Sequence, residues 1–346
     1  MYNNNIVMKF SIIIPHFNVP DLLERALSSI PNRQDTEIIV VDDSSSEENK
    51  LKLRAVCKES SKPVRLLEQP NNMGGGAARN AGMDVAIGDF LLFLDADDFF
   101  NECINDIMNE YANDEKHDVI FFKASSVDNV TLEPRDRLNY LNDQIDKWLA
   151  NPQKGEIELR YSFGVPVCKL IRRSVVVENN LRFDETRIHN DTTFAYQLGY
   201  VANQICADVR FGYCATIREG SVSRQESDEL RLVTINILGR AVLFFREKLH
   251  ISHMEDQLSF NLYILLRKRS YKYFIKGIDE LVKIGFSRDD IFSFFSRQMA
   301  LDSLKSTIWV ILFSPIFKIK ILSLKGIFRY TIISCFKNKK ALYTLL

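Results

Sequence analysis

Short, strongly apolar segments alternate with helix-like segments through the first hundred residues of this 346-residue chain. Runs of Ile, Val, Leu and Phe indicate buried strands, and apolar residues at helical spacing indicate amphipathic helices between them. Strands are predicted at 10–15, 37–41, 64–67 and 90–94, and helices at 20–29, 50–59 and 74–86. Strands that alternate with helices form βαβ units, so the pattern predicts an α/β fold with a mostly parallel sheet flanked by helices.

The rest of the chain has a different pattern. A further strand is expected at 118–123, a polar, irregular stretch at 125–154, a strand and a helix within 167–179, and a helix at 192–202. From about residue 227 onward the sequence favours helices. We therefore expect four parts, namely an N-terminal tail, two halves of one α/β domain and a helical C-terminal region. Their expected ranges are 1–8, 9–105, 106–225 and 226–346.

Charge and cysteine content narrow the class of protein. The 45 basic and 45 acidic side chains balance, which argues against a dedicated nucleic-acid-binding protein. The six cysteines form no CxxC pair and no zinc-ligand spacing, as expected for free thiols in a reducing cytoplasm. The N-terminus lacks the features of a secretory signal, and the apolar stretch 306–317 is too short to span a bilayer.

Polar clusters follow three of the predicted strands. Pro15-His16-Phe17-Asn18, Asp42-Asp43-Ser44 and Asp95-Ala96-Asp97-Asp98 each begin where an apolar run ends. Ligands of such sheets bind beyond the carboxyl ends of the strands. We therefore expect the three clusters to meet at one edge of the sheet and to form one binding site.

The last of these clusters has the pattern of a metal site. Asp95 and Asp97 are two residues apart at a strand end, where their carboxylates can share one Mg²⁺ or Mn²⁺ with phosphate oxygens. A divalent cation bound there neutralises a diphosphate leaving group. The alternative is a solvated acidic turn.

Three further groups admit both a structural and a functional role. Asp42-Asp43 can bind a base or a ribose, or can form an Asx turn or a helix N-cap. The glycines at 74–76 open a helix whose N-terminus favours anions, and Arg79 can pair with a phosphate or with a neighbouring aspartate. The spacing matches neither GxxxxGK[ST] nor GxGxxG. Asp191, before the helix at 192–202, is either an N-cap or a general base.

In this order and at this spacing, the motifs resemble those of family 2 glycosyltransferases with the GT-A fold, of the type that builds bacterial O-antigen and capsule polysaccharides. FSIIIPHFN, EIIVVDDSSS, NNMGGGAARNAG and GDFLLFLDADDF resemble the N-terminal half, and CKLIRRSVVVENNLRFDETRIHNDTTF resembles the second half. The resemblance extends from about residue 9 to about residue 200. It implies a Rossmann-like nucleotide-binding sheet and a nucleotide-sugar donor.

The resemblance also implies a role for each matching position. Phe17 would stack on the base, Asp43 would hydrogen-bond uracil, which favours a UDP-sugar, and Asp191 would be the catalytic base. Asp97, assisted by Asp95, would bind Mn²⁺ or Mg²⁺. The implied nucleotide-sugar site consists of Pro15, Phe17, Asn18, Asp42, Asp43, Gly75, Arg79, Asp95 and Ala96. The sequence departs from the family pattern at Asn190, where glutamate is usual.

This reading implies an inverting transfer in which Asp191 takes a proton from the acceptor hydroxyl as it attacks the anomeric carbon. A processive synthase would also carry transmembrane helices and a QxxRW element, and neither is present in the sequence. A catalytically inactive homologue that binds nucleotide and acts as a scaffold remains the alternative. A dinucleotide-dependent dehydrogenase is disfavoured because the first turn lacks the glycine fingerprint.

The C-terminal segment 303–346 contains eight basic residues and no acidic one. Lys318, Lys325 and Arg329 share one face of a helix that is otherwise rich in Ile, Leu and Phe. Such a helix lies in the interface of an anionic membrane, although packing against the domain is the alternative. With the resemblance, this segment predicts a cytoplasmic enzyme, peripheral on the inner face of the plasma membrane, that acts on a lipid-linked glycan acceptor.

Overall fold

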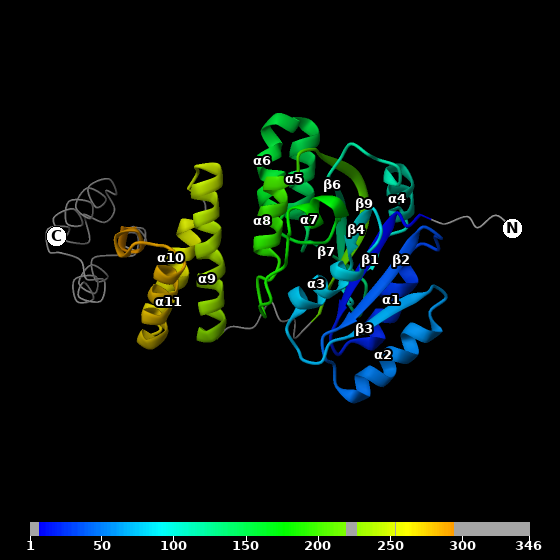
Figure 1. The fold of residues 1–346 in the computed structure, drawn as a ribbon, viewed down its shortest axis with the longest axis horizontal. Coiled ribbons are helices and arrows are strands. Elements are labelled where there is room, and N and C mark those ends of the chain that lie inside the picture. The colour runs from blue at the N-terminus through cyan, green and yellow to red at the C-terminus, as the bar shows by residue number, and fades with distance from the viewer. Residues whose placement is uncertain (1–6, 219–226, 253, 294–346) are drawn as a thin grey trace. The chain divides into compact units, whose positions relative to one another are not determined.

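The computed structural model describes residues 7–218, 227–252 and 254–293. The chain divides into two compact units, 1–225 and 226–346, here called the N-terminal and C-terminal units (Figure 1). In the described residues the N-terminal unit is α/β and the C-terminal unit is helical. The predicted α/β fold with a helical C-terminal region is therefore confirmed.

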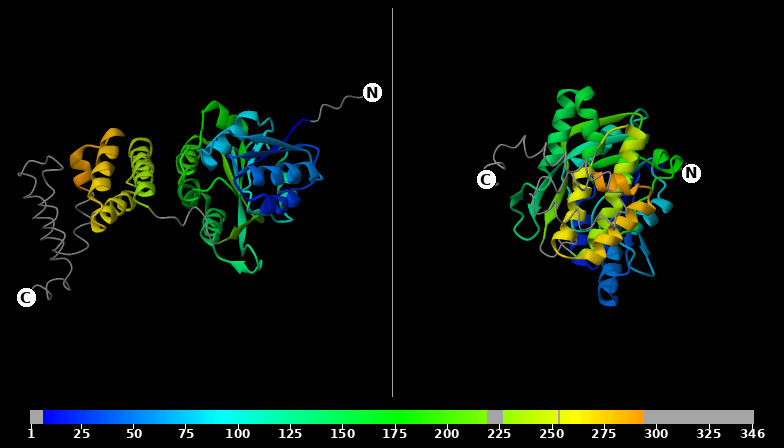
Figure 2. Two further views of the ribbon diagram at one scale, coloured as in Figure 1. Left: turned by 90° about the horizontal axis from the view of Figure 1, so that it is seen from below. Right: turned by 90° about the vertical axis from the view of Figure 1, so that its left-hand side faces the viewer.

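The first half of the N-terminal unit consists of parallel strands joined by helices. These are β1 (Phe10–His16), α1 (Pro20–Ser29), β2 (Thr36–Asp42), α2 (Glu47–Glu59), β3 (Val64–Glu68), α3 (Gly75–Val85) and β4 (Phe90–Phe93). β1 lies between β2 and β4 and is parallel to both. The apolar run of β1 is continuous because helices flank the sheet on both sides, so that neither face of β1 is left to water (Figure 2).

The second half of this unit completes the same sheet. It contains β5 (Phe99–Phe100), α4 (Ile104–Tyr111), β6 (Val119–Asp128), β7 (Pro134–Arg135), α5 (Asn139–Ala150), α6 (Pro152–Ser162), β8 (Lys169–Arg172), α7 (Arg173–Glu178), α8 (Thr192–Val201) and β9 (Ile205–Ile217). The sheet order is β3-β2-β1-β4-β8-β6-β9-β5, with β7 beside β6. β8 runs antiparallel to both β4 and β6 and so joins the two halves.

The expectation of an irregular stretch at 125–154 is wrong. β6 continues to Asp128, and α5 and the start of α6 fill most of the remainder. α5 forms although it is largely polar, because Leu141 and Ile145, four residues apart, are both buried. Asn151 caps α6 by accepting a hydrogen bond from the Lys154 backbone N–H.

β9 was not expected from the sequence, although it is the longest strand of the sheet described here. It pairs in parallel with β6 from Val119 to Asp128, and the register shifts around Lys123. These irregularities break the simple alternation of apolar and polar residues that would reveal a strand in the sequence. β9 matters for the site because Tyr213 and Thr216 lie near its C-terminal end, and Arg218 directly follows the strand.

In the part of the C-terminal unit that the structure describes, helices pack around an apolar core of their own. α9 (Asp228–Phe244) continues into a π-helical turn, η2 (Phe245–Leu249), and is followed by α10 (Glu255–Arg267) and α11 (Tyr271–Lys283). Leu238, Leu262 and Ile278 lie in the core between them. Among the described helices, none combines the length and the apolar character needed to cross a bilayer. The predicted membrane-associated segment 303–346 lies outside the described residues.

Candidate active site

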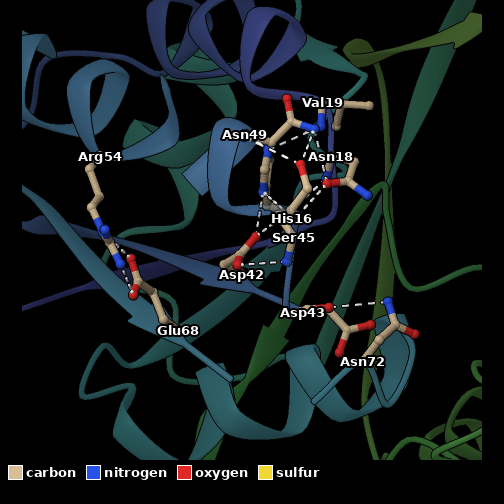
Figure 3. Close-up of polar contacts among 11 residues, drawn as sticks. His16, Asn18, Val19, Asp42, Asp43, Ser45, Asn49, Arg54, Glu68 and Asn72 are labelled. Carbon is tan, nitrogen blue, oxygen red and sulfur yellow. Dashed lines mark hydrogen bonds and ion pairs between the residues drawn. The ribbon is translucent and has the colours of Figure 1, made fainter. Parts of the chain in front are cut away.

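β1 and β2 end in a buried polar network (Figure 3). His16 and Asp42 are 1% and 0% exposed, and 2.9 Å separates His16 Nδ1 from Asp42 Oδ1. Burial lowers the pKa of His16, and its Nε2 accepts a hydrogen bond from the Val19 N–H, so Nδ1–H donates to Asp42. Asp42 also accepts hydrogen bonds from the backbone N–H and the hydroxyl of Ser45. Asp42 therefore shapes the two turns and, against expectation, presents no surface to a ligand.

Asn18 and Phe17 form the turn after β1. Asn18 adopts a left-handed conformation, with φ 55°, and its Oδ1 accepts hydrogen bonds from Ser46 N at 2.8 Å and Asn49 Nδ2 at 3.0 Å. These bonds tie the turn to the start of α2. Phe17 is 46% exposed, so the ring is available for stacking, whereas the preceding Pro15 is half-buried.

Asp43 holds the loop that precedes α3. Its Oδ1 and Oδ2 accept hydrogen bonds from the backbone N–H groups of Met73 and Gly74, both at 2.8 Å. Burial raises the pKa of Asp43, although these two bonds oppose the rise. Each carboxylate oxygen retains a free lone pair, so Asp43 can still accept a hydrogen bond from a base N–H.

The glycines before and within α3 permit a close approach to the segment 184–186. A Cβ on Gly76 would lie 2.0 Å from the carbonyl oxygen of Asp184, and one on Gly74 would lie 2.9 Å from that of Thr186. Gly74 also has φ +91°, which favours glycine. In this structure these two glycines pack α3 against the segment that leads to Asp191. Gly75, between them, is the first residue of the helix.

Arg79 of α3 connects the acidic cluster with the residues around Asp191. Its Nη2 lies 2.6 Å from Asp95 Oδ1, and its Nη1 donates to Asn190 Oδ1 at 3.0 Å. Of the two partners considered for Arg79, the structure thus shows the aspartate. Asn190 accepts the guanidinium hydrogen bond at the position where glutamate is usual in the family that the sequence resembles.

One carboxylate oxygen from each of Asp95, Asp97 and Asp98 lies within 4.8 Å of the other two. Asp95 uses Oδ1 for Arg79, and Asp97 uses Oδ2 for Arg218 Nε, at 2.8 Å. Within the described ranges, Oδ2 of Asp95 and Oδ1 of Asp97 have no hydrogen-bond partner. A cluster of carboxylates this close together can share one divalent cation that keeps further sites for phosphate or water.

Asp98 has a structural role in the cluster. It is 5% exposed, and its carboxylate accepts hydrogen bonds from Tyr213 Oη at 2.6 Å and Thr216 N at 2.7 Å. Burial, together with the charges of Asp97 and Asp95, raises the pKa of Asp98 to about 8. These contacts fix the cluster to β9. The intervening Ala96 is buried, so only its backbone can face a ligand.

Four further residues hold the acidic cluster and were not expected from the sequence: Arg218, Tyr213, Thr216 and Arg25. Thr216 Oγ1 and Arg25 Nη2 both donate to the backbone carbonyl of Asp97 at 2.7 Å. No local motif marks these residues. If β9 had been predicted, Tyr213, Thr216 and Arg218 could have been placed near the acidic cluster, because they lie in or directly after this strand.

Asp191 occupies the N-cap position of α8, but its side chain makes no capping hydrogen bond. In the part of the chain that the structure describes, its carboxylate hydrogen-bonds no other residue. Burial raises the pKa of Asp191; the charge of Arg79 opposes this rise and that of Asp95 adds to it. An unpaired carboxylate with a raised pKa can accept a proton from a substrate.

Comparisons with known proteins agree with this architecture. The sequence family described as "Glycosyl transferase family 2" matches residues 11–178. Poly(ribitol-phosphate) beta-glucosyltransferase of Bacillus spizizenii is 26% identical over 212 residues, which cover 60% of this chain and 32% of that protein. GalNAc(5)-diNAcBac-PP-undecaprenol beta-1,3-glucosyltransferase of Campylobacter jejuni is 41% identical over 92 residues, 26% of this chain and 30% of that protein. The matches thus span about a third of the length of these relatives.

A solved structure shows the same fold. The crystal structure of Staphylococcus aureus TarS 1–349 in complex with UDP-GlcNAc has a TM-score of 0.60 and 18% sequence identity, over 85% of this chain and 86% of that one. The expected GT-A fold is therefore confirmed. Residues 11–178 of the N-terminal unit thus match glycosyl transferase family 2 in sequence, and the likeness to TarS shows the same fold.

Proposed function

We propose that this glycosyltransferase moves a sugar from a UDP-sugar donor to a hydroxyl of a glycan acceptor, with inversion at the anomeric carbon. The observation that carries the proposal is the Asp191 carboxylate, which hydrogen-bonds no other described residue and directly follows Asn190, the hydrogen-bond partner of Arg79. A general base at the border of a diphosphate site is the arrangement that direct displacement requires.

Two features support uracil as the base of the donor nucleotide. Phe17 presents an exposed ring for stacking, and Asp43 retains lone pairs for the uracil N–H. The TarS structures that share the fold were determined in complex with UDP-GlcNAc and with UDP. Pro15, Asn18, Gly75 and Ala96 complete the nucleotide-sugar site in this proposal, with Asp42 acting behind it.

The reaction is one displacement. Asp191 accepts the proton of the acceptor hydroxyl, the oxygen of that hydroxyl forms a bond to the anomeric carbon, and the bond from that carbon to the diphosphate breaks. The electron pair of the broken bond leaves with UDP. Asp95 and Asp97 would hold Mn²⁺ or Mg²⁺, which neutralises charge on the diphosphate. Arg79 and Arg218, which pair with these two aspartates, add positive charge beside the same site.

The proposed acceptor is a polyprenyl-diphosphate-linked intermediate of surface polysaccharide, an O-antigen or a capsule. The name of the Campylobacter relative, which describes an undecaprenol-linked acceptor, supports this class. The basic and apolar composition of 303–346 supports a peripheral position on the inner face of the plasma membrane. Deletion of 303–346 is expected to release the protein from vesicles rich in anionic lipid.

The experiment is to measure UDP or GDP release from UDP-Glc, UDP-GlcNAc, UDP-Gal, UDP-GalNAc and GDP-Man, with Mn²⁺ or Mg²⁺ and with excess EDTA. Metal-dependent release of UDP from one of the UDP-sugars is expected. Binding of UDP without release from any donor would instead favour the inactive scaffold, and a preference for GDP-Man would overturn the uridine assignment.

A further inference from the structure

The end of α10 and the start of α11 carry a concentrated positive charge. Five exposed basic side chains, here called the basic patch, lie close together in this part of the chain, namely Arg267, Lys268, Arg269, Lys272 and Lys276. No acidic residue occurs between 257 and 278. Within the described ranges, Arg267, Arg269 and Lys272 pair with no carboxylate. The charge of the patch is therefore not neutralised by the helices that carry it.

The electrostatics of the two helices explains only part of this charge. Arg267 and Lys268 lie at the end of α10, where the negative end of the helix dipole favours a cation. Lys272 is the second residue of α11, where the positive end of the dipole disfavours a cation. The first turn of α11 contains no acidic residue to offset this repulsion. Lys272 thus does not stabilise its own helix.

Arg269 occupies a backbone position that favours glycine. Its φ is 60°, in the left-handed region. The Arg269 N–H donates to the carbonyl of Leu266 at 3.0 Å, and the Ser270 N–H donates to that of Leu265 at 2.9 Å. These are the two hydrogen bonds that end a helix on a left-handed residue, which is usually glycine. An arginine at this position lowers the stability of the turn, a cost that is expected where a side chain serves a function outside the fold.

Exposed apolar side chains accompany the cations on both helices. Phe260 is 49% exposed and lies on the same face of α10 as Arg267, two turns further on. Ile275 is 39% exposed and lies on the face of α11 that carries Lys272 and Lys276. Such a surface matches the interface of an anionic bilayer, where cations meet headgroup phosphates and apolar side chains enter the acyl boundary. Nucleic-acid phosphates would match the cations but would leave Ile275 exposed to water.

We propose that the basic patch docks the enzyme onto the headgroup phosphates of an anionic bilayer. The inference rests on the peripheral membrane position in the proposed function, and it adds a contact in the described part of the chain to that of 303–346. Each basic residue near an anionic leaflet adds to the attraction, so a cluster of them binds more tightly than the same charges dispersed over the protein. The two contacts strengthen the same attachment.

The test compares two variants of the full chain that lose the same charge. The patch variant carries Arg267→Gln, Arg269→Gly and Lys272→Gln. The control variant carries substitutions at exposed positions of the N-terminal unit, namely Lys52→Gln, Lys58→Gln and Lys116→Gln. Binding is measured by sedimentation with vesicles of equal parts phosphatidylglycerol and phosphatidylcholine, at about 0.1 M NaCl, where nearby charges still interact. Vesicles of phosphatidylcholine alone test the dependence on anionic lipid.

The patch variant is expected to require at least about tenfold more anionic lipid for half-maximal binding than the unmutated chain. The control variant should stay within about twofold of the unmutated chain, because its substitutions lie outside the patch. The unmutated chain should bind the phosphatidylcholine vesicles at least about tenfold more weakly than the anionic ones.

Arg269 separates the effect on binding from an effect on folding. Arg269→Gly is expected to weaken binding to the anionic vesicles about fivefold, while the midpoint of thermal unfolding stays the same or rises, because glycine suits the left-handed conformation. Arg269→Lys keeps the charge and should bind the vesicles as the unmutated chain does. A purely structural role of Arg269 would give the opposite order of stability and no change in binding.

Equal binding by the patch and control variants would overturn the proposal and leave 303–346 as the membrane contact. Failure of the unmutated chain to bind anionic vesicles would also overturn it, as would a loss in Arg269→Lys equal to that in Arg269→Gly. Tighter binding of a single-stranded oligonucleotide than of the vesicles would assign the patch to nucleic acid instead. Failure of the proposed function is a separate outcome, because UDP release from the sugar donors is measured without vesicles and should be the same in the patch variant.

Discussion

The proposed donor region and the proposed acceptor region differ in how their polar groups are satisfied. In the proposed donor region, Asp42 and Asp43 use their carboxylates to hold His16, Ser45 and the loop before α3. In the proposed acceptor region, the Asp191 carboxylate accepts no hydrogen bond from any other described residue. The proposed donor region is thus preorganised by its own hydrogen bonds, whereas the carboxylate that we propose as the base is left open.

The two aspartates Asp43 and Asp191 show what this difference does. Burial raises the pKa of both, but backbone N–H bonds from Met73 and Gly74 oppose the rise for Asp43. Asp191 has no such bonds from other residues within the described ranges. Asp43 is therefore suited to remain a fixed acceptor of hydrogen bonds, and Asp191 is suited to take up a proton.

The largest effect is expected from Asp97→Asn. The substitution replaces a carboxylate of the acidic cluster with a neutral amide and so removes the charge that would hold the cation. Sugar transfer is expected to fall by about 10²-fold or more, since a bound metal contributes several kcal/mol. The measurement is UDP release at saturating Mn²⁺, with thermal unfolding as the check that the fold is retained. Undiminished turnover of the unmutated enzyme in excess EDTA would contradict the metal role.

Asp191→Asn should reduce kcat by roughly 10²- to 10⁴-fold, the typical cost of losing a general base. In the unmutated enzyme, kcat/KM should fall as the pH drops through the pKa of Asp191, because only the ionised carboxylate accepts a proton. Burial raises that pKa above the usual aspartate range, so the fall occurs at a higher pH than an exposed aspartate would give. A near-normal kcat in the variant would show that another residue is the general base, and the neighbouring His189 would be the next candidate.

Asp42→Ala is expected to lower the stability of the protein, because Asp42 holds the turns after β1 and β2. It leaves the His16 Nδ1–H and the Ser45 N–H buried without their acceptor. The free energy of unfolding is expected to fall by about 1–3 kcal/mol, measured by urea denaturation. Glu102→Ala, at an exposed position, serves as the control. Equal stability of the two variants would mean that the network does not hold the turns.

A smaller, pH-dependent effect is expected from the buried Lys169 of β8. Lys169 donates to the carbonyls of Phe163 and Val165, and burial lowers its pKa to about 7 from 10.5. The unfolded chain binds this proton more tightly, so the contribution of Lys169 to the free energy of unfolding rises with pH between about 7 and 10.5, by at most about 1.4 kcal/mol per pH unit. Lys169→Met should unfold with a weaker pH dependence over this range than the unmutated protein. An identical pH dependence would show that the ammonium group is not desolvated.

The sequence was sufficient for the donor region because its information is local. Each strand is a short apolar run, and each functional cluster follows a strand directly, so Asp43, Asp95 and Asp97 could be placed at one edge of the sheet. The structure changed the role of Asp42, since only tertiary packing reveals that a side chain in a polar cluster is wholly buried.

The acceptor region could not be predicted in the same way. α5 is amphipathic but largely polar, and β9 has an irregular register, so both were missed. Arg218 reaches Asp97 of the acidic cluster only because it follows the end of β9. Asp191 was left between an N-cap and a base because the choice depends on where one side chain points, which no local pattern specifies.

In the proposed function, Asp43 binds the uridine nucleotide and Asp191 acts on the acceptor alone. Titration calorimetry of UDP and GDP with the unmutated protein, Asp43→Ala and Asp191→Asn tests it most directly. We predict that UDP binds more tightly than GDP, that Asp43→Ala raises the Kd for UDP roughly 10- to 100-fold, as expected for a hydrogen bond to a charged group, and that Asp191→Asn leaves the Kd unchanged. Tighter binding of GDP, or a loss of UDP binding in Asp191→Asn but not in Asp43→Ala, would contradict the account.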